Sequence, residues 1–274
     1  MAEGPLASYG ASIVAGYITI DSVRAVLKAA ETEFNMTNVQ AGLWGYSNGA
    51  SATEAAVEFA PKYAPELKLA GAAIGGLTPK LISSGPVLSG TQVAGLLVQG
   101  IIGVTSQYPD ERKYILDRLY PDGPYNVTEF FWATYMSGWQ SLLYYSYVNV
   151  FEYFRGGQAD LEVPHLVDMF VREGTLGGFG VPNTKIFMYH AVYDDLTPIE
   201  ETDELVSNFC QKGSSILYHR NFWGGHNDEL TNGRQRSLDF FANIFDGSNV
   251  LSVPVSGCQT VNLTFMQDPS KPIA

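Results

Sequence analysis

The pentapeptide Gly45-Tyr46-Ser47-Asn48-Gly49 decides how the rest of the sequence is interpreted. An apolar run at residues 39–44 precedes it, and a run of helical character at residues 50–62 follows it. A G-x-S-x-G motif between a strand and a helix is typical of a nucleophile elbow. There a strained turn lifts the serine Oγ clear of the sheet, and the glycines let strand and helix approach closely. The alternative is an ordinary strand–turn–helix with a capping serine, so the motif needs partner residues elsewhere.

Composition indicates a globular protein with a large core. The 274 residues are 46% hydrophobic and 16% charged, which suits one large α/β domain with an insertion or two modest domains. The net charge of −12 argues against nucleic-acid binding and against anionic membrane surfaces. The longest apolar stretch, residues 93–104, is broken by glycines and is too short to span a bilayer, so we expect no stable membrane insertion. The first residues lack the basic start and apolar region of a signal peptide.

Elements near the elbow alternate in the way that builds a parallel sheet. The pattern predicts a helix at 12–30, a strand at 39–44, a helix at 50–62 and a strand at 69–74.

The same alternation returns near the C-terminus. It predicts a strand at 185–190, a helix at 200–212, a strand at 215–219 and a closing helix at 234–245. The tail, residues 250–274, is proline-spaced and is expected to lie over the body of the protein.

Residues 77–182 interrupt this α/β pattern. They predict helical pieces at 89–104, 110–119 and 126–154, the last of them rich in aromatic residues. A segment of this length between two strands is too long for a connection. We interpret it as an inserted helical cap or lid, with residues 1–76 and 183–274 forming the α/β core.

A serine at an elbow needs a histidine to take its proton and a carboxylate to orient that histidine. In α/β hydrolases these follow in the order serine, acid, histidine. Asp194, directly after a predicted strand, is the candidate acid, with Asp195 as its competitor; capping of the next helix by Asp195 or Thr197 is the alternative role for this region.

His226 is the candidate base. It follows Trp223-Gly224-Gly225 in a predicted loop before the closing helix. The other three histidines are interpreted as structural: His165 in the insertion, and His190 and His219 as buried strand residues.

The backbone N–H of Asn48, next to the serine, is the expected first oxyanion donor. A second donor normally comes from a loop upstream, but no earlier strand or HGGG-type loop is recognised in the 46 residues before Ser47. The sequence contains no Cys-x-x-Cys, His-Glu-x-x-His or G-x-G-x-x-G motif, so neither a metal nor a cofactor is expected.

Two further features concern the cellular compartment. Cys210 and Cys258 are compatible with two reduced thiols or one disulfide. N-glycosylation sequons at Asn35, Asn126 and Asn262 each give weak support for secretion.

With these residues in place, the chain resembles the fungal secretory lipases of the lipase A type, within the α/β-hydrolase superfamily. The resemblance runs from Glu3 nearly to the C-terminus. It rests on separate motifs in the right order: Glu3-Gly-Pro-Leu-Ala-Ser8, the elbow, Tyr63-Ala-Pro-Glu-Leu67, Gly75-Gly76, His190-Ala-Val-Tyr-Asp194-Asp195 with Pro198, Phe209-Cys-Gln-Lys-Gly213 and the loop around His226.

The resemblance implies Ser47 as nucleophile, Asp194 as orienting acid and His226 as base. It makes residues 77–182 a lid over an acyl-binding tunnel, and it implies a Cys210–Cys258 disulfide and a secreted glycoprotein. Members of the family carry a signal peptide and a further N-terminal segment with the first strands of the sheet and the second oxyanion donor. Against them the chain is expected to be N-terminally truncated and to lack those strands.

The expected function is that of a triacylglycerol lipase or other carboxylic ester hydrolase. It would act through an acyl-enzyme on lipid or acyl-ester substrates at a lipid–water interface. One alternative is a serine acyltransferase or peptidase on the same scaffold. Another is a non-catalytic, truncated lipase-like fragment or binding module.

Overall fold

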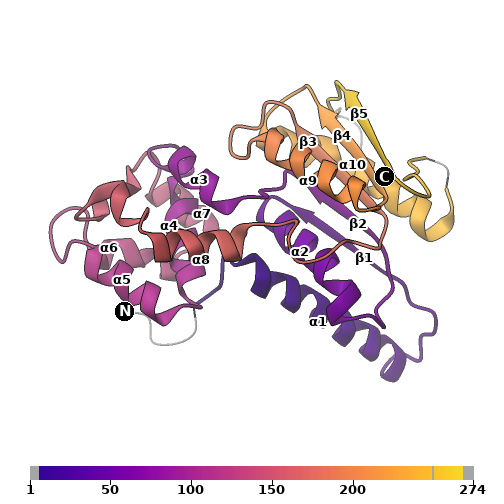
Figure 1. The fold of residues 1–274 in the computed structure, drawn as a ribbon, viewed down its shortest axis with the longest axis horizontal. Coiled ribbons are helices and arrows are strands. Elements are labelled where there is room, and N and C mark those ends of the chain that lie inside the picture. The colour runs from indigo at the N-terminus through magenta and orange to yellow at the C-terminus, as the bar shows by residue number, and fades with distance from the viewer. Residues whose placement is uncertain (1–5, 249, 268–274) are drawn as a thin grey trace. The chain divides into compact units, whose positions relative to one another are not determined.

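The computed structural model describes residues 6–248 and 250–267, and they form two compact units (Figure 1). The α/β unit consists of Ser12–Pro79 and the described residues from Leu176 onward. The helical unit consists of Lys80–Thr175 together with described residues before Ser12.

The α/β unit is built on one parallel sheet. Within the described residues it has five strands in the order β1-β2-β3-β4-β5, and every neighbouring pair is parallel. The strands are β1 (Ala41–Tyr46), β2 (Leu69–Gly75), β3 (Ile186–Ala191), β4 (Ile216–Asn221) and β5 (Cys258–Leu263). The predicted α/β class with a parallel sheet is confirmed.

Alternating side chains of the strands fill two cores, one on each face of the sheet. The central strand β3 is buried along its whole length, as expected for a parallel strand covered on both faces. One face packs against α2 (Asn48–Tyr63) and α9 (Ile199–Gln211), and the other packs against α10 (His226–Asp246). The first core includes Val57, Ile74, Ile186, Met188, Leu205, Phe209 and Ile216; the second includes Ala73, Phe187, Tyr189, Leu217 and Phe240.

Helix α1 (Ser12–Thr32) packs on α2 rather than on the sheet itself. A Cβ on Gly16 would lie 2.8 Å from Cβ of Ala55, so this glycine is what allows the two helices to come close. The predicted helix at 12–30 is confirmed.

Helix α10 begins at His226, eight residues before the predicted start at Arg234. The added stretch, residues 226–233, is polar and ends in Asn232-Gly233, so its sequence predicts a loop. Buried contacts make it helical instead. Glu229 forms an ion pair with Arg236, and a Cβ on Gly233 would lie 2.0 Å from the ring of Tyr189.

Strand β5 corrects the interpretation of the C-terminal tail. Instead of only lying over the body, residues 258–263 extend the sheet in register with β4, pairing Ile216 with Cys258 and Asn221 with Leu263. Part of the predicted tail, residues 268–274, lies outside the described residues.

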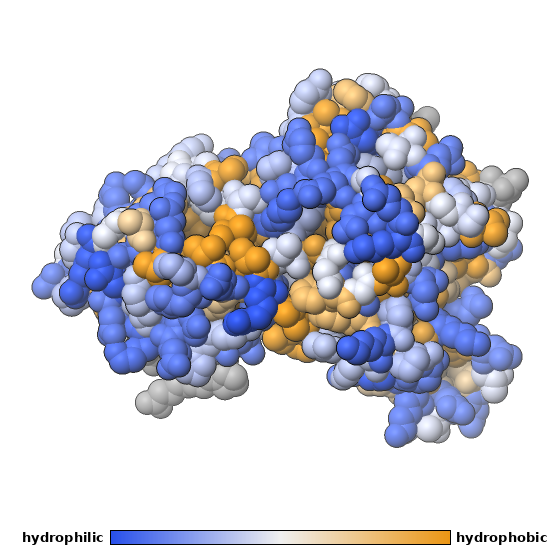
Figure 2. All heavy atoms as spheres, viewed as in Figure 1, coloured by the Kyte–Doolittle hydropathy of each residue, from blue (hydrophilic) through white to orange (hydrophobic). Residues whose placement is uncertain are grey.

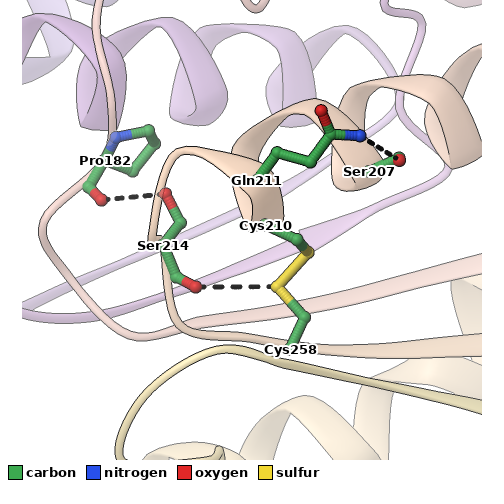
Figure 3. Close-up of a disulfide and its surroundings, with 6 residues drawn as sticks. All are labelled: Pro182, Ser207, Cys210, Gln211, Ser214 and Cys258. Carbon is green, nitrogen blue, oxygen red and sulfur yellow. Dashed lines mark hydrogen bonds between the residues drawn. A yellow bond between two sulfur atoms is a disulfide. The ribbon is translucent and has the colours of Figure 1, made fainter.

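A disulfide joins Cys210, at the end of α9, to Cys258, at the start of β5 (Figure 3). The Sγ atom of Cys258 also lies 3.6 Å from the carbonyl oxygen of Ser214, in the turn that leads into β4. The bridge implied by the family resemblance is therefore present. It fixes the outermost strand of the sheet to a helix 48 residues earlier in the chain.

The helical unit consists of short helices around its own core. They are α3 (Leu81–Leu88), α4 (Ala94–Thr105), α5 (Pro109–Arg118), α6 (Val127–Phe131), η1 (Trp132–Tyr135), α7 (Gly138–Tyr144), η2 (Val150–Tyr153), η3 (Gly157–Asp160) and α8 (Pro164–Gly174).

Two predicted helices of this unit differ in the structure. The piece at 126–154 becomes α6, η1, α7 and η2, because Ser137 caps a new helix through a capping box with Gln140. The piece at 89–104 is shorter at its start, because Gly90 has a φ of +75° and separates α3 from α4.

Apolar side chains lie on the surface of η1 and α7. Trp139 is 79% exposed and Leu143 is 80% exposed, and Trp132, Tyr135 and Tyr147 are also exposed. Figure 2 shows one face of the molecule, which is largely hydrophilic and has apolar residues, in orange, gathered in a few places. Among the described helices, none combines the length and the apolar character that crossing a membrane requires.

Candidate active site

Ser47 lies at a strained turn between β1 and α2. Its φ is 56° and its ψ is −123°, a left-handed conformation that costs free energy for a residue with a side chain. A hydrogen bond from its N–H to the carbonyl oxygen of Gly75 holds the turn against β2. Strain of this kind at a serine between a strand and a helix is the geometry of a nucleophile elbow.

The two glycines of the motif differ in their importance. A Cβ on Gly45 would lie 2.0 Å from the carbonyl oxygen of Gly49, so the close approach of strand and helix requires glycine there. A Cβ on Gly49 would have no atom within 4 Å. The expectation that both glycines make room is confirmed for Gly45 and wrong for Gly49.

The structure brings together the three side chains predicted to react. Nε2 of His226 lies 3.0 Å from Oγ of Ser47, and Nδ1 of His226 lies 2.7 Å from Oδ2 of Asp194. His226 is the first residue of α10 and not a loop residue as predicted. The helix start fixes its backbone and leaves the ring turned toward the elbow.

The side chain of Asp194 is completely buried, and both of its oxygens have hydrogen-bond donors. Its Oδ1 accepts the N–H groups of Leu196 at 2.9 Å and Thr197 at 2.8 Å. Burial by itself would raise the pKa of Asp194, but hydrogen bonds from His190 and His226 outweigh burial and hold the pKa below its ordinary value. The carboxylate therefore stays ionised at neutral pH, facing the ring of His226.

Asp195 has a different role from its neighbour. It was expected either to compete for the histidine or to cap the helix that follows. Instead its Oδ1 accepts the backbone N–H of His226 at 3.1 Å, at the start of α10. Helix α9 begins after Pro198 with no side-chain cap, so capping by Asp195 or Thr197 is wrong.

Tyr46 contacts His226, which the sequence did not suggest. Its hydroxyl donates to the backbone carbonyl oxygen of His226, and its ring lies 5.1 Å from the imidazole. Its position beside Ser47 in the motif was the available signal. Together, Asp195 and Tyr46 hold both polar groups of the His226 backbone.

The other histidines lie where the sequence placed them. His190 and His219 are buried and hydrogen-bonded, the latter to Arg236. His165 packs edge-on against Tyr114 in the helical unit. None of the three contacts Ser47 among the interactions of the described residues.

Asn48 is the first residue of α2. N–H groups of the first helical turn have no acceptor within their own helix, and the helix dipole makes this end electropositive. The described residues contain no group of three or more His, Cys, Asp or Glu side chains arranged to hold a metal ion.

Comparison with known proteins places the fold in a defined class. The solved structure of Candida antarctica lipase A in its closed state matches with a TM-score of 0.79 at 25% identity, covering 97% of this chain and 61% of that one. The fold is therefore that of the α/β hydrolases.

The family follows from the sequence comparison. The model of the secretory lipase family matches residues 2–253, and the chain belongs to this family. A trichothecene C-3 esterase of Fusarium sporotrichioides is 38% identical over 96% of this chain and 59% of its own length. A probable trichothecene esterase of Stachybotrys chartarum is 35% identical over 90% of this chain and 50% of its own length. The chain thus spans half to three-fifths of the length of these relatives.

Proposed function

We propose that this chain carries the catalytic site of a carboxylic ester hydrolase that works through Ser47, His226 and Asp194. The observation that carries the proposal is the unbroken series of contacts from Ser47 Oγ through the His226 ring to Asp194, at 3.0 Å and 2.7 Å. Membership of the secretory lipase family supports the same reaction class.

The mechanism follows from the two ring nitrogens of His226. Nδ1–H donates to Asp194, which leaves Nε2 unprotonated and able to accept the proton of Ser47 as Oγ attacks the ester carbonyl carbon. The N–H of Asn48 is the proposed donor to the oxyanion that forms. His226 then gives its proton to the departing alcohol. Water, activated in the same way, hydrolyses the acyl-enzyme and restores Ser47.

Long-chain acyl esters such as triacylglycerols are the first proposed substrate class. The family supports it, and so does a neutral surface on the helical unit. From Phe130 to Phe151 the sequence contains no charged residue, although the chain has a net charge of −12. Trp139 and Leu143 of this stretch are largely exposed. Tryptophan and tyrosine side chains favour the boundary between water and lipid, so we propose that this surface contacts the lipid–water interface.

A trichothecene ester is the second candidate, because the two esterase relatives are 38% and 35% identical. The two classes are separated by measuring kcat/KM on an emulsified triacylglycerol and on a trichothecene C-3 ester. We further propose that the helical unit is the inserted domain that decides between them.

Secretion is proposed from two observations. The family is described as secretory, and the Cys210–Cys258 disulfide is the kind of bond that persists in oxidising compartments.

The test of the reaction compares wild type with Ser47→Ala on a soluble ester. Loss of the nucleophile is expected to lower kcat on the order of 10⁶-fold. Ser83→Ala, a serine in α3 of the helical unit, is the matched control and should retain the wild-type rate. Equal rates for wild type and Ser47→Ala would refute the proposal.

A further inference from the structure

Asp194 faces a second histidine in addition to His226. Nε2 of His190 lies 3.3 Å from Oδ2 of Asp194, the same oxygen that contacts His226. The His190 side chain is completely buried on β3, four residues before the carboxylate. Asp194 therefore lies between two imidazoles, of which only His226 contacts the serine.

The surroundings of His190 determine which ring nitrogen carries the proton. Nδ1 lies 3.1 Å from the hydroxyl of Thr202, which can donate to it. Nε2 lies 3.1 Å from both the carbonyl oxygen and the hydroxyl of Thr197, and 3.3 Å from the Asp194 carboxylate. The carbonyl oxygen and the carboxylate can only accept, whereas the hydroxyl can donate or accept. The neutral ring that satisfies all of these partners is protonated on Nε2, so its N–H is directed at Asp194 and Thr197.

We propose that His190 is a positioning residue that fixes the Asp194 carboxylate through Oδ2, and through it holds the ring of His226 toward Ser47. The proposal rests on the function proposed above. A buried carboxylate has lost its hydration, so its ionised form is stable only when hydrogen-bond donors replace the lost water. Backbone N–H groups supply Oδ1, whereas Oδ2 has only the two histidines in the described contacts.

The consequence for His226 follows from the oxygen that the two histidines share. Without the His190 donor, Oδ2 keeps only His226 among the described contacts, and the carboxylate is held less firmly in the position that aligns this ring. The imidazole is then less well directed at Oγ of Ser47, so proton transfer slows while ester binding is little changed.

The experiment compares His190→Leu with His190→Gln, which keeps an N–H donor at a position similar to Nε2. The concentration of active enzyme is counted with a fluorophosphonate probe, and kcat and KM are measured on a soluble ester. For His190→Leu we expect kcat per labelled site to fall about ten- to a hundredfold, the worth of a hydrogen bond to a charged group, with little change in KM. His190→Gln should restore most of the lost kcat.

His219→Gln is the matched control, because His219 is also a buried strand histidine but contacts Arg236 and not Asp194. It should lower stability without lowering kcat per labelled site. The inference is overturned if His190→Leu keeps the wild-type kcat per labelled site, or if His219→Gln lowers it equally. Wild type and Ser47→Ala are assayed alongside, so that equal rates for those two would refute the proposed function itself and not only the role of His190.

Discussion

The α/β unit buries some of its charged side chains, whereas the helical unit exposes some of its large apolar ones. In the α/β unit, two buried carboxylates have polar partners: Glu58 accepts three backbone N–H groups, and Glu229 binds Arg236 and Asn221. In the helical unit, the stretch from Phe130 to Phe151 carries no charge and exposes large apolar side chains. Single substitutions should therefore disturb chemistry and pH response in the first unit, and surface binding in the second.

The neighbouring acids of the α/β unit give the largest expected effect. Asp194→Asn should lower kcat on the order of 10⁴-fold, because an amide cannot hold His226 in the required tautomer. Asp195→Asn, one residue away, keeps an oxygen that accepts the backbone N–H of His226, and should cost less than tenfold. Rates are measured on a soluble ester, per active site. Equal losses in the two variants would contradict the separate roles assigned to the two residues.

Buried polar groups also make the α/β unit sensitive to acid. Burial, followed by the charge of Arg236, lowers the pKa of His219 to about 4 from its ordinary value of 6.5. The folded state thus favours the neutral ring. The resulting stability is complete above pH 6.5 and is lost as the pH falls toward 4, by roughly 2–3 kcal/mol.

Replacing His219 by glutamine should flatten this part of the stability curve, measured by urea unfolding between pH 4 and 7. The exposed His165, changed to glutamine in the helical unit, is the control and should leave the slope unchanged. An unchanged slope in His219→Gln would show that the titration lies elsewhere.

The smallest effect on stability is expected in the helical unit. Trp139→Ala with Leu143→Ala removes two side chains that are 79% and 80% exposed, so the free energy of unfolding should change by less than about 0.5 kcal/mol. Binding to an emulsion should nevertheless weaken roughly tenfold for each side chain, because that is the apolar burial it would lose. Activity on a soluble short-chain ester should not change.

A matched pair in the α/β unit sharpens this comparison. Ile18 and Val26 of α1 are also exposed, at 56% and 66%. If Ile18→Ala with Val26→Ala weakens emulsion binding as much as the α7 pair does, the neutral stretch has no special role.

The sequence predicted those parts of the molecule that depend on local patterns. Alternating strands and helices around residues 12–76 and 185–219 were visible as apolar runs, and the order Ser47, Asp194, His226 identified the three side chains that meet. The start of α10 could not be predicted, because it depends on Glu229 pairing with Arg236 and on Gly233 packing against Tyr189. Strand β5 was missed because an outer strand has only a short, half-buried alternation.

In the site, too, local patterns were predictable and contacts between distant residues were not. A motif predicts residue types, and so it found the three side chains that meet. It does not predict which neighbours will lie around them. The contacts of Tyr46, Asp195 and His190 join the loop after β3, the elbow and the start of α10 in space, and they became visible only with the fold.

The central claim is that Ser47 is a nucleophile activated by His226 and Asp194. The most direct measurement is reaction with a fluorophosphonate probe, followed by mass spectrometry of the labelled peptide. The predicted result is a single adduct on Ser47 that forms on the order of 10⁴-fold more slowly in Asp194→Asn. An adduct on another residue, or ester hydrolysis at the full rate by protein that the probe does not label, would contradict the account.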